Sequence, residues 1–268
     1  MLIRWCSSYI RVAAAGIVAI VFLLHIHNAH ATSLADKKIG IVLLHGKGGT
    51  DKLVASLAAA LKDDGVMVLT PLMPWSRDRI YDKSYEEAMD EIDGHVAALR
   101  AAGAQRIVMA GHSLGANAAL GFGARRSGLS GIILLAYGHV PGKRGMAKKL
   151  AGSVEKAREM IGAGRGEDIA DFYDTGGGNS TARGSAHDIF SWFDPDGPAT
   201  LSHNAPAVTP NTPVLCVDGQ HDEWKRCDEI LTLVPRHFKN EKTLVDADHV
   251  GTPVAAYGVV LNWLQNLN

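Results

Sequence analysis

The residues best suited to chemistry lie in the sequence GHSLG at 111–115, which places Ser113 between two glycines. An apolar run, RIVMA at 106–110, precedes this motif, and a segment rich in Ala and Leu follows it. A G-x-S-x-G sequence between a strand and a helix is typical of a sharp turn that exposes the serine hydroxyl. The N-terminus of the following helix directs unpaired N–H groups toward the same place. Ser113 is therefore our candidate nucleophile.

The chain also offers a base and an acid that could activate this serine. A serine hydroxyl is a weak nucleophile at neutral pH, so it needs a base, and the base needs an orienting acid. His249 follows the last short apolar run of the chain, which places it at the same sheet edge as Ser113. Asp222 lies in a loop beyond another apolar run, from where it can reach His249. Three other carboxylates compete for the acid role: Asp218, which sits at the strand end and could instead fix the turn, Asp246 and Asp248.

The elements that must position these residues alternate between short apolar strands and amphipathic helices. Strands are expected at residues 39–45, 66–70, 106–110, 130–137, 213–217 and 242–245. Helices are expected around residues 53–61, at 85–102, after 113, at 225–234 and at the C-terminus. The C-terminal helix is expected to carry Val254, Tyr257, Leu261 and Leu264 inward. This alternation predicts an α/β protein with a doubly wound, mostly parallel sheet that is buried on both faces.

Between about residues 138 and 210 the alternation stops. The segment is richer in Gly, Asp and Ser, and its most turn-like part is GGGNSTARGSAH at 176–187. One amphipathic helix is expected between Met146 and Ile161. So long an excursion between two strands predicts a functional insertion, which we expect to cap Ser113. Aromatic side chains from this segment and from the loop after the second strand are expected to line an apolar substrate pocket: Trp75, His139, Trp192 and Phe193.

Four segments together resemble the sequence landmarks of the α/β-hydrolase superfamily. They are LLHGKGG at 43–49, GHSLG at 111–115, GQHD at 219–222 and DH at 248–249. The chain order of nucleophile, acid and base is also the order of that superfamily. The resemblance extends over nearly the whole chain after residue 31, and in particular it is similar to single-domain bacterial esterases and to dienelactone-hydrolase-like or lipase-like members. It implies the α/β-hydrolase fold, here without the two antiparallel strands that often open it.

The resemblance also implies an oxyanion hole made of two backbone N–H groups. One donor is Leu114, which follows the nucleophile, and the other is Lys47 in the HGKGG turn. Two such donors must already point at the substrate oxygen when the serine attacks. The Lys47 side chain is not required for this role, and the plain expectation for it is an exposed loop lysine.

Composition excludes several other classes of protein. The 268 residues carry 27 basic and 28 acidic side chains, a formal net charge of −1, so no nucleic-acid partner is expected. At 47% hydrophobic and 21% charged, the chain has an ordinary globular composition that predicts one large α/β domain. No CxxC or Cys/His ligand spacing occurs, and we expect neither a metal nor a cofactor.

The first 31 residues differ from the rest. Arg4 and Arg11 precede an uncharged run at 12–24, and the small-residue triplet AHA follows at 29–31. This order predicts a secretory signal peptide at 1–31, cleaved after Ala31, and a hydrolase domain at 32–268. The mature protein is then expected to be periplasmic or secreted, with no stable membrane anchor. An uncleaved N-terminal anchor is the alternative.

Two cysteines, Cys216 and Cys227, remain after such a cleavage and flank the loop of Asp222. Export places them where disulfides persist, and a bridge would rigidify the position of the acid. The alternative is that Cys216, in an expected buried strand, is a small core hydrophobe. The sequence leaves both open.

These features predict an exported serine hydrolase that cleaves carboxylic esters through an acyl-enzyme. Because Lys47 is the one charged group expected near the oxyanion site, we expect neutral, short-to-medium acyl esters as small-molecule substrates. The pocket decides which acyl bond a triad cleaves, so a thioesterase, an amidase or peptidase and a polyester-fragment hydrolase are alternatives. A second class of alternative is a non-catalytic binding protein on a hydrolase scaffold. The sequence does not indicate the oligomeric state.

Overall fold

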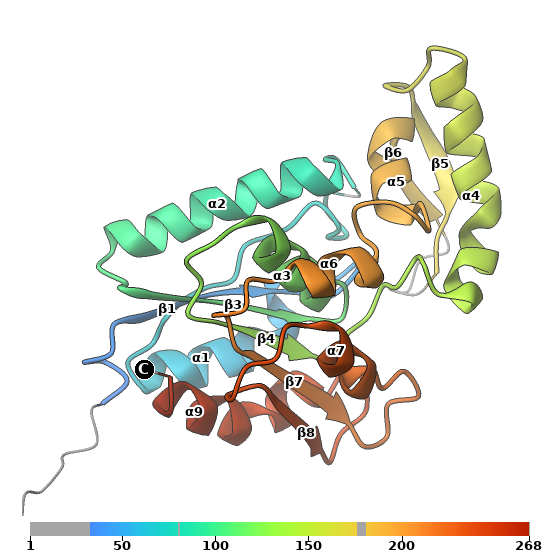
Figure 1. The fold of residues 1–268 in the computed structure, drawn as a ribbon. Coiled ribbons are helices and arrows are strands. Elements are labelled where there is room, and N and C mark those ends of the chain that lie inside the picture. Colours follow the sequence, from blue (N-terminus) through green and yellow to red (C-terminus); the bar gives the residue numbers. More distant parts are fainter. Residues whose placement is uncertain (1–32, 80, 176–180, 268) are drawn as a thin grey trace, which may run out of the picture. The chain divides into compact units, whose positions relative to one another are not determined.

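The computed structural model describes residues 33–79, 81–175 and 181–267, and the expected signal peptide at 1–31 lies outside these ranges. Six strands form one sheet in the order β2-β1-β3-β4-β7-β8 (Figure 1). In that order, their bounds are Met67–Leu69, Ile39–Leu44, Arg106–His112, Gly131–Leu135, Val214–Gly219 and Glu241–Val245. Every neighbouring pair is parallel, which confirms the mostly parallel α/β sheet expected from the sequence.

Helices bury both faces of this sheet. α1 (Ala55–Asp63) and α9 (Tyr257–Gln265) cover one face, and α2 (Tyr85–Ala101) and α3 (Leu114–Arg125) cover the other (Figure 1). Successive strand residues point to opposite sides, so each strand contributes to two cores. In β1 the residues at 41 and 43 join the core under α1 and α9, whereas those at 42 and 44 join the core under α2 and α3. The apolar runs of the sequence are continuous for this reason.

α2 shows how local sequence sets a helix boundary. The Ser84 hydroxyl accepts a hydrogen bond from the Glu87 N–H, and the Glu87 carboxylate accepts one from the Ser84 N–H. This capping box satisfies two of the N–H groups that a helix start leaves unpaired. Gly103, with a φ of 100°, ends the helix in a conformation that favours glycine. The helix predicted at 85–102 is therefore confirmed.

The C-terminal helix differs from its prediction. The chain forms two short helices, α8 (Thr252–Ala255) and α9, so one helical period does not run through both. Val254 is 58% exposed, although the periodicity placed it inward. The buried positions on this segment are Thr252 and Pro253 in α8, Ala256 at the junction, and Val260, Trp263 and Leu264 in α9. The inward placement of Val254 was wrong because α8 ends after four residues.

The segment 138–210 lies between β4 and β7, which are neighbours in the sheet. Its elements are α4 (Arg144–Gly162), β5 (Ile169–Tyr173), β6 (Thr181–Ser185), α5 (Ala186–Phe193) and α6 (Leu201–Ala207). α4 matches the predicted amphipathic helix. β5 and β6 form a separate antiparallel pair, and α4, β5, β6 and α5 group beyond one end of the main sheet (Figure 1).

Part of this segment was misinterpreted from the sequence as turn-like. Residues 181–187 form strand β6 and the start of α5. β6 exists because it pairs with β5, and the Ser185 hydroxyl caps α5 by accepting the Asp188 N–H. The remaining elements are η1 (Asp51–Leu53) after β1 and α7 (Cys227–Leu233) after β7. Within the described ranges, the helices include none with the length and apolar character needed to cross a membrane.

Candidate active site

The three residues expected to form a catalytic triad meet at one edge of the sheet. Ser113 follows β3, Asp222 lies in the loop after β7, and His249 follows β8. The strands are parallel, so their C-terminal ends share an edge, where α/β folds build their sites. His249 Nε2 lies 2.9 Å from Ser113 Oγ, and His249 Nδ1 lies 2.7 Å from Asp222 Oδ2. The structure therefore joins all three side chains in one hydrogen-bonded chain.

The turn that presents Ser113 is strained and depends on glycines. Ser113 has a φ of 55° and a ψ of −117°, a conformation that side-chain-bearing residues rarely adopt. A Cβ at Gly111 would lie 2.1 Å from the Gly115 carbonyl oxygen, and one at Gly115 would lie 2.4 Å from the Leu44 carbonyl oxygen. Neither clash can be relieved by a side-chain rotation, since both involve backbone atoms. The G-x-S-x-G spacing is thus a packing requirement of this turn.

Two further glycines keep the space beside the serine open. A Cβ at Gly138 would lie 2.6 Å from Ser113 Oγ, and one at Gly46 would lie 3.2 Å from Ser113 Cβ. Both follow strands of the same sheet, β4 and β1. Sequence reasoning noted Gly138 only as the start of the insertion. Its place after a strand at the same sheet edge was the signal for a role beside the nucleophile.

The hydrogen bonds separate Asp222 from Asp218. Asp222 is 3% exposed, and its second oxygen accepts the Trp224 N–H at 2.8 Å, which fixes the carboxylate toward His249. The Asp218 carboxylate accepts the N–H groups of the two residues at 226 and 227, each at 2.9 Å. Burial raises the pKa of Asp218. Asp218 thus fixes the turn, the alternative role that its position at the strand end suggested.

The two weaker rivals are bound elsewhere. Asp246 Oδ1 lies 2.8 Å from Nε2 of His221 at the exposed surface. Asp248 Oδ1 accepts the Gly251 N–H at 2.7 Å and helps to fold the loop that carries His249. Asp222 is consequently the carboxylate that contacts the imidazole.

His112 contacts the backbone of His249, the candidate base, a contact that was not predicted from the sequence. Its Nε2 lies 2.8 Å from the backbone oxygen of His249, and the two rings are 5.1 Å apart. A contact with a carbonyl oxygen requires that Nε2 carry the proton. Burial lowers the pKa of His112 to about 4, so the ring is neutral at pH 7. The available signal was its place directly before the nucleophile.

The turn after β1 presents the expected oxyanion donor. The Gly48 N–H donates to the Trp75 carbonyl at 2.8 Å, and the Gly49 N–H donates to the Gly46 carbonyl at 3.1 Å. Among the described residues, no hydrogen-bond acceptor contacts the N–H of Lys47 or that of Leu114 at the start of α3. Both expected donors are therefore available to a ligand.

The side chain of Lys47 differs from the expected exposed loop lysine. It is 10% exposed, and its Nζ lies 2.6 Å from Asp174 Oδ1 and 3.0 Å from the Thr175 carbonyl oxygen. Burial lowers the pKa of Lys47, and the Asp174 carboxylate opposes this shift. The expectation of exposure was wrong because the partner lies 127 positions away in the insertion.

The four residues expected to line a substrate pocket are buried. Their exposed fractions are 1% for Trp75, 4% for His139, and 0% for both Trp192 and Phe193. The Trp192 ring lies 5.3 Å from that of Trp75 and 4.7 Å from that of Tyr85, so it packs the insertion onto the body. His139 Nε2 contacts the Trp192 carbonyl at 2.8 Å. Contact of these four residues with substrate stays a prediction.

An exposed aromatic residue beside the base was also missed. Trp224 is 56% exposed, and its ring lies 5.2 Å from the His249 ring in an edge-to-face arrangement. Val250, the residue after His249, is 60% exposed. The base is therefore flanked by apolar surface that solvent reaches. The signal in the sequence was a tryptophan two positions after the acid.

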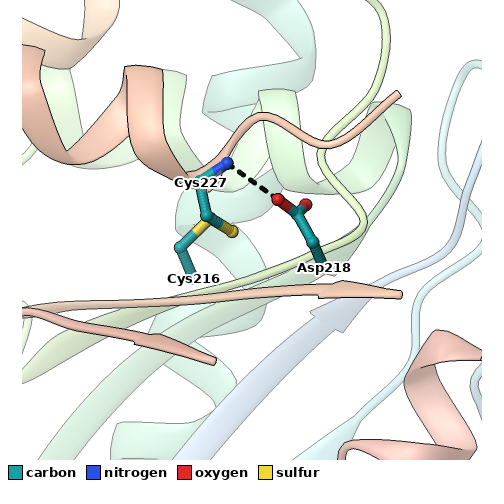
Figure 2. A group of neighbouring side chains, drawn as sticks. All are labelled: Cys216, Asp218 and Cys227. Atoms are coloured by element: carbon teal, nitrogen blue, oxygen red, sulfur yellow. Dashed lines mark hydrogen bonds between the residues drawn. A yellow bond between two sulfur atoms is a disulfide. The ribbon is translucent and has the colours of Figure 1, made fainter. Parts of the chain in front are cut away.

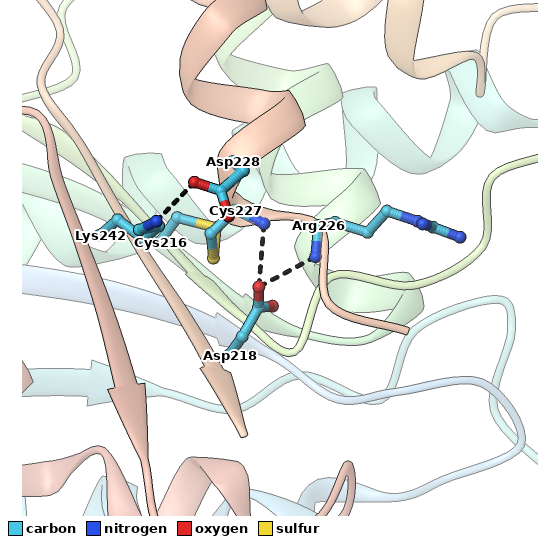
Figure 3. The surroundings of a disulfide bond; sticks show 6 residues. All are labelled: Cys216, Asp218, Arg226, Cys227, Asp228 and Lys242. Carbon is cyan, nitrogen blue, oxygen red and sulfur yellow. Dashed lines mark hydrogen bonds and ion pairs between the residues drawn. A yellow bond between two sulfur atoms is a disulfide. The ribbon is translucent and has the colours of Figure 1, made fainter. Parts of the chain in front are cut away.

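A disulfide joins Cys216 and Cys227, whose Cα atoms are 5.4 Å apart (Figure 2). It links β7 to the first residue of α7 and lies beside Asp218 near the end of β7 (Figure 3). The loop that carries Asp222 lies between the two cysteines in the sequence. This finding decides between the two possibilities that the sequence left open for the cysteines. Cys216, Asp218 and Cys227 are also the only group with metal-ligand spacing in the part of the chain described here. A metal would require thiolates at both cysteines, which the bridge removes.

Comparisons with known proteins find several structures with a similar fold. The structure is similar to a highly thermostable carboxyl esterase from Bacillus coagulans, with 14% identity, a TM-score of 0.63, and 85% and 90% of the two chains covered. It is also similar to the Paleococcus ferrophilus monoacylglycerol lipase, with 18% identity, a TM-score of 0.58, and coverage of 85% and 95%. A thioesterase domain from the curacin biosynthetic pathway has 13% identity, a TM-score of 0.53, and coverage of 84% and 90%.

No curated protein matches the chain in sequence. The three structural likenesses show a shared fold. The sequence model described as the Alpha/beta hydrolase family matches residues 41–260, which include every sheet strand after the first two residues of β1. The chain therefore belongs to the alpha/beta hydrolase family.

Proposed function

We propose that this protein is a serine hydrolase that cleaves carboxylic esters through an acyl-enzyme. The observation that carries the proposal is the hydrogen-bonded chain from Asp222 through His249 to a strained Ser113. In that chain the Asp222 carboxylate accepts a hydrogen bond from the Nδ1–H of His249, which leaves Nε2 unprotonated and able to take the hydroxyl proton of Ser113. The triad thereby supplies a nucleophile and a base in contact.

In the first half of the reaction, Ser113 Oγ attacks the ester carbonyl carbon while His249 Nε2 takes the hydroxyl proton. The carbonyl oxygen becomes an oxyanion, and the N–H groups of Leu114 and Lys47 donate to it. His249 then protonates the leaving alkoxide as the carbon–oxygen bond breaks. The products are an alcohol and an ester between the acyl group and Ser113.

In the second half, His249 removes a proton from water, which attacks the acyl-enzyme at the same carbon. The same two N–H groups stabilise the second oxyanion, and Ser113 leaves with the proton held by His249. The acid product is released and the starting state is restored. Besides the ester itself, these steps use only groups of the chain and one water molecule.

The ester bond is favoured within this family by two observations. Two of the similar structures are a carboxyl esterase and a monoacylglycerol lipase. Apolar surface from Trp224 and Val250 flanks His249, which protonates the leaving group. A neutral alcohol with apolar carbons suits that surface better than a charged one. Thioesters, amides and polyester fragments remain the alternatives with the same triad.

In this proposal, the insertion 138–210 is a cap that borders the site and sets substrate choice. Its first residues support this role, because Gly138 lies against Ser113 Oγ. Trp192 and Asp174 attach the insertion to loops that follow β2 and β1. Substrates that reach Ser113 must then pass beside this segment.

Export is also part of the proposal, with residues 32–268 as the mature enzyme in the periplasm or outside the cell. Its support is the signal-like order of residues 1–31 and the disulfide between Cys216 and Cys227. Disulfides persist in oxidising compartments and are rare in the cytosol. N-terminal sequencing of protein from the culture medium and the periplasm tests the cleavage after Ala31.

The decisive experiment combines active-site labelling with substrate profiling. A fluorophosphonate probe should label the purified protein at Ser113 and leave Ser113→Ala unlabelled. A p-nitrophenyl ester series of increasing chain length, beside thioester and peptide substrates, should show fastest turnover for short-to-medium esters. Absence of both labelling and turnover in folded protein would assign the chain to the non-catalytic class. Faster turnover of thioesters or peptides would assign the thioester or the peptide bond, in place of the ester bond, as the one that the enzyme cleaves.

A further inference from the structure

A buried ion pair connects the expected oxyanion turn to the insertion. Lys47 Nζ lies 2.6 Å from Asp174 Oδ1, and the two side chains are 10% and 5% exposed. Asp174 follows β5, and its neighbour Thr175 also contacts Nζ through its carbonyl oxygen at 3.0 Å. Lysine in a loop ordinarily keeps its charge in water. Burial of the Lys47 ammonium is therefore unusual for a loop residue, and its position suggests a functional role for the pair.

Asp174 has further partners that hold it in place. Its Oδ1 accepts the Thr175 N–H at 2.6 Å, and its Oδ2 lies 3.3 Å from the Tyr81 hydroxyl. Burial raises the pKa of Tyr81, so its hydroxyl keeps the proton that it donates. Tyr81 belongs to the loop between β2 and α2. Three segments far apart in the sequence thus converge on one carboxylate.

The turn that contains Lys47 is rich in glycine, and backbone hydrogen bonds hold it through Gly48 and Gly49 but not through the N–H of Lys47. Glycines stand at 46, 48 and 49, and Gly48 has a φ of 60°. Glycine gives the backbone more accessible conformations than any other residue. In this four-residue stretch, Lys47 is the one residue whose side chain can tie the backbone to its surroundings. A fixed Nζ restricts the Lys47 Cα and, with it, the direction of the adjoining N–H.

We infer that Asp174 is a positioning residue for the oxyanion hole, acting through the Lys47 side chain on the Lys47 N–H. This inference rests on the proposed function, because it assumes that this N–H stabilises an oxyanion. The insertion then does more than border the substrate, since its attachment at Asp174 sets the alignment of a group that acts in the transition state. Coupling of this kind makes the rate of catalysis depend on the position of the insertion against the body.

If the inference holds, removal of the carboxylate charge should lower kcat and leave KM nearly unchanged. In Asp174→Asn the buried ammonium loses its counter-ion, so Lys47 turns toward water or gives up its proton, and the turn loses its anchor. A donor that acts on the oxyanion stabilises the transition state and not the bound ester. The kcat of Asp174→Asn should therefore fall about 10- to 100-fold, less than the roughly 100- to 1,000-fold loss that follows complete removal of one such donor, because the N–H is misaligned and not removed. KM should change less than about threefold, since ground-state binding is retained.

The experiment compares Asp174→Asn with a matched control in the same protein. Glu91→Gln removes the carboxylate of the Arg79–Glu91 pair, which also joins a loop to a neighbouring element but lies outside the site. Steady-state kinetics on p-nitrophenyl butyrate should show the kcat loss in Asp174→Asn alone. A trifluoromethyl ketone adds to Ser113 Oγ as a hemiketal, whose former ketone oxygen is an oxyanion. Its inhibition constant should therefore rise by the same factor as kcat falls. Asp174→Glu keeps the carboxylate and should therefore lose less kcat and less ketone affinity than Asp174→Asn.

A folded double variant keeps the test decisive if Asp174→Asn unfolds. Lys47→Met with Asp174→Leu replaces the pair by apolar side chains of similar size, a change that buried ion pairs often tolerate. Its kcat should still fall, because the backbone N–H of residue 47 is no longer held by a polar side-chain anchor. Wild-type kcat and wild-type ketone affinity in a folded Asp174 variant would overturn the inference while the ester hydrolase stands. Wild-type protein without turnover or labelling would instead defeat the proposed function.

Discussion

The body and the insertion of this molecule are built in different ways. The body has a six-stranded sheet with a core on each face, and the residues of its central strands are almost fully buried. The insertion has a two-stranded sheet with one covered face: Phe172 is 2% exposed, whereas Ile169 and Tyr173 are 58% and 53% exposed. The three residues of the proposed triad all belong to the body. The proposed chemistry therefore lies on the part with the deeper core.

The insertion shares the core under α2 and α3 with the body, through residues of α5 and α6. Within this contact Trp192 packs against Trp75, Tyr81 and Tyr85, and outside it Asp174 pairs with Lys47. Because the proposed nucleophile, base and acid all lie in the body, changes to them should abolish turnover, whereas changes in the insertion should alter rate and selectivity by smaller factors. The following variants test that division.

The largest effect is expected for Ser113→Ala. Loss of the nucleophile should lower kcat about a million-fold if the triad acts as a unit, and His249→Ala should be similarly severe. Ser113 makes no side-chain cap for α3, so the variant should remain folded. Hydrolysis of p-nitrophenyl butyrate and a thermal denaturation curve measure both properties. Exposed Ser202→Ala is the control. Rates within tenfold of wild type for Ser113→Ala would remove the mechanism.

Asp218 near the end of β7 and Asp222 in the loop after it should differ in the kind of effect that their substitution has. Asp222→Asn should lower kcat by about 10⁴, because the amide does not hold the imidazole tautomer or stabilise the imidazolium. Asp218→Asn keeps one oxygen acceptor for the N–H groups of Arg226 and Cys227, so its main cost should be stability. Kinetics and denaturation of both variants check this ranking. A larger kcat loss in Asp218→Asn would transfer the acid role to Asp218.

Much of the body and its site could be predicted from the sequence, because local patterns determine them. Strands buried on both faces give continuous apolar runs, and the G-x-S-x-G motif is a pattern of five consecutive residues, although its Gly115 is required by a contact with the distant Leu44 backbone. Ser113, His249 and Asp222 could be placed together because each follows a strand of one parallel sheet. The limits of β3, β7 and β8 differ from the expected ones by no more than a few residues.

The insertion and its attachments could not be predicted in the same way. β6 is polar in sequence and becomes a strand only because β5 pairs with it. The burial of Lys47 depends on a carboxylate 127 positions away, which no local pattern reports. The contact of His112 with the His249 backbone spans 137 positions. Val254 was misplaced because the chain changes helix at Ala256.

The disulfide should stabilise the acid loop more than it changes chemistry. The double variant Cys216→Ala, Cys227→Ala removes a bridge that spans 11 positions, a loss of about 3 kcal/mol in the chain-entropy model. For a domain of this size, that loss corresponds to a decrease in Tm of roughly 6–12 °C. Calorimetry of the variant, and of wild type with and without reductant, measures it. Two free thiols in unfolded, unreduced protein, or an unchanged Tm, would contradict the prediction.

The smallest effect concerns two buried histidines, His112 in the body and His139 at the start of the insertion. Burial lowers their pKa values from 6.5 to about 4 and about 3, so both are neutral in the folded protein at pH 5. The unfolded chain binds their protons below pH 6.5, so stability must fall as pH decreases from 6.5 toward the folded values. Each proton contributes up to about 1.4 kcal/mol per pH unit, or roughly 2 kcal/mol between pH 6.5 and pH 5.

Substitution of each histidine isolates its share of this pH dependence. Gln at 112 can still donate to the His249 carbonyl but does not titrate, and Gln at 139 can likewise donate to the Trp192 carbonyl. The difference in unfolding free energy between pH 7 and pH 5, measured with urea, should shrink in His112→Gln and in His139→Gln. It should stay at the wild-type value in exposed His203→Gln. A reduced pH dependence in His112→Gln alone would mean that the insertion opens before the body unfolds, because a locally released His139 takes up its proton without opposing global stability.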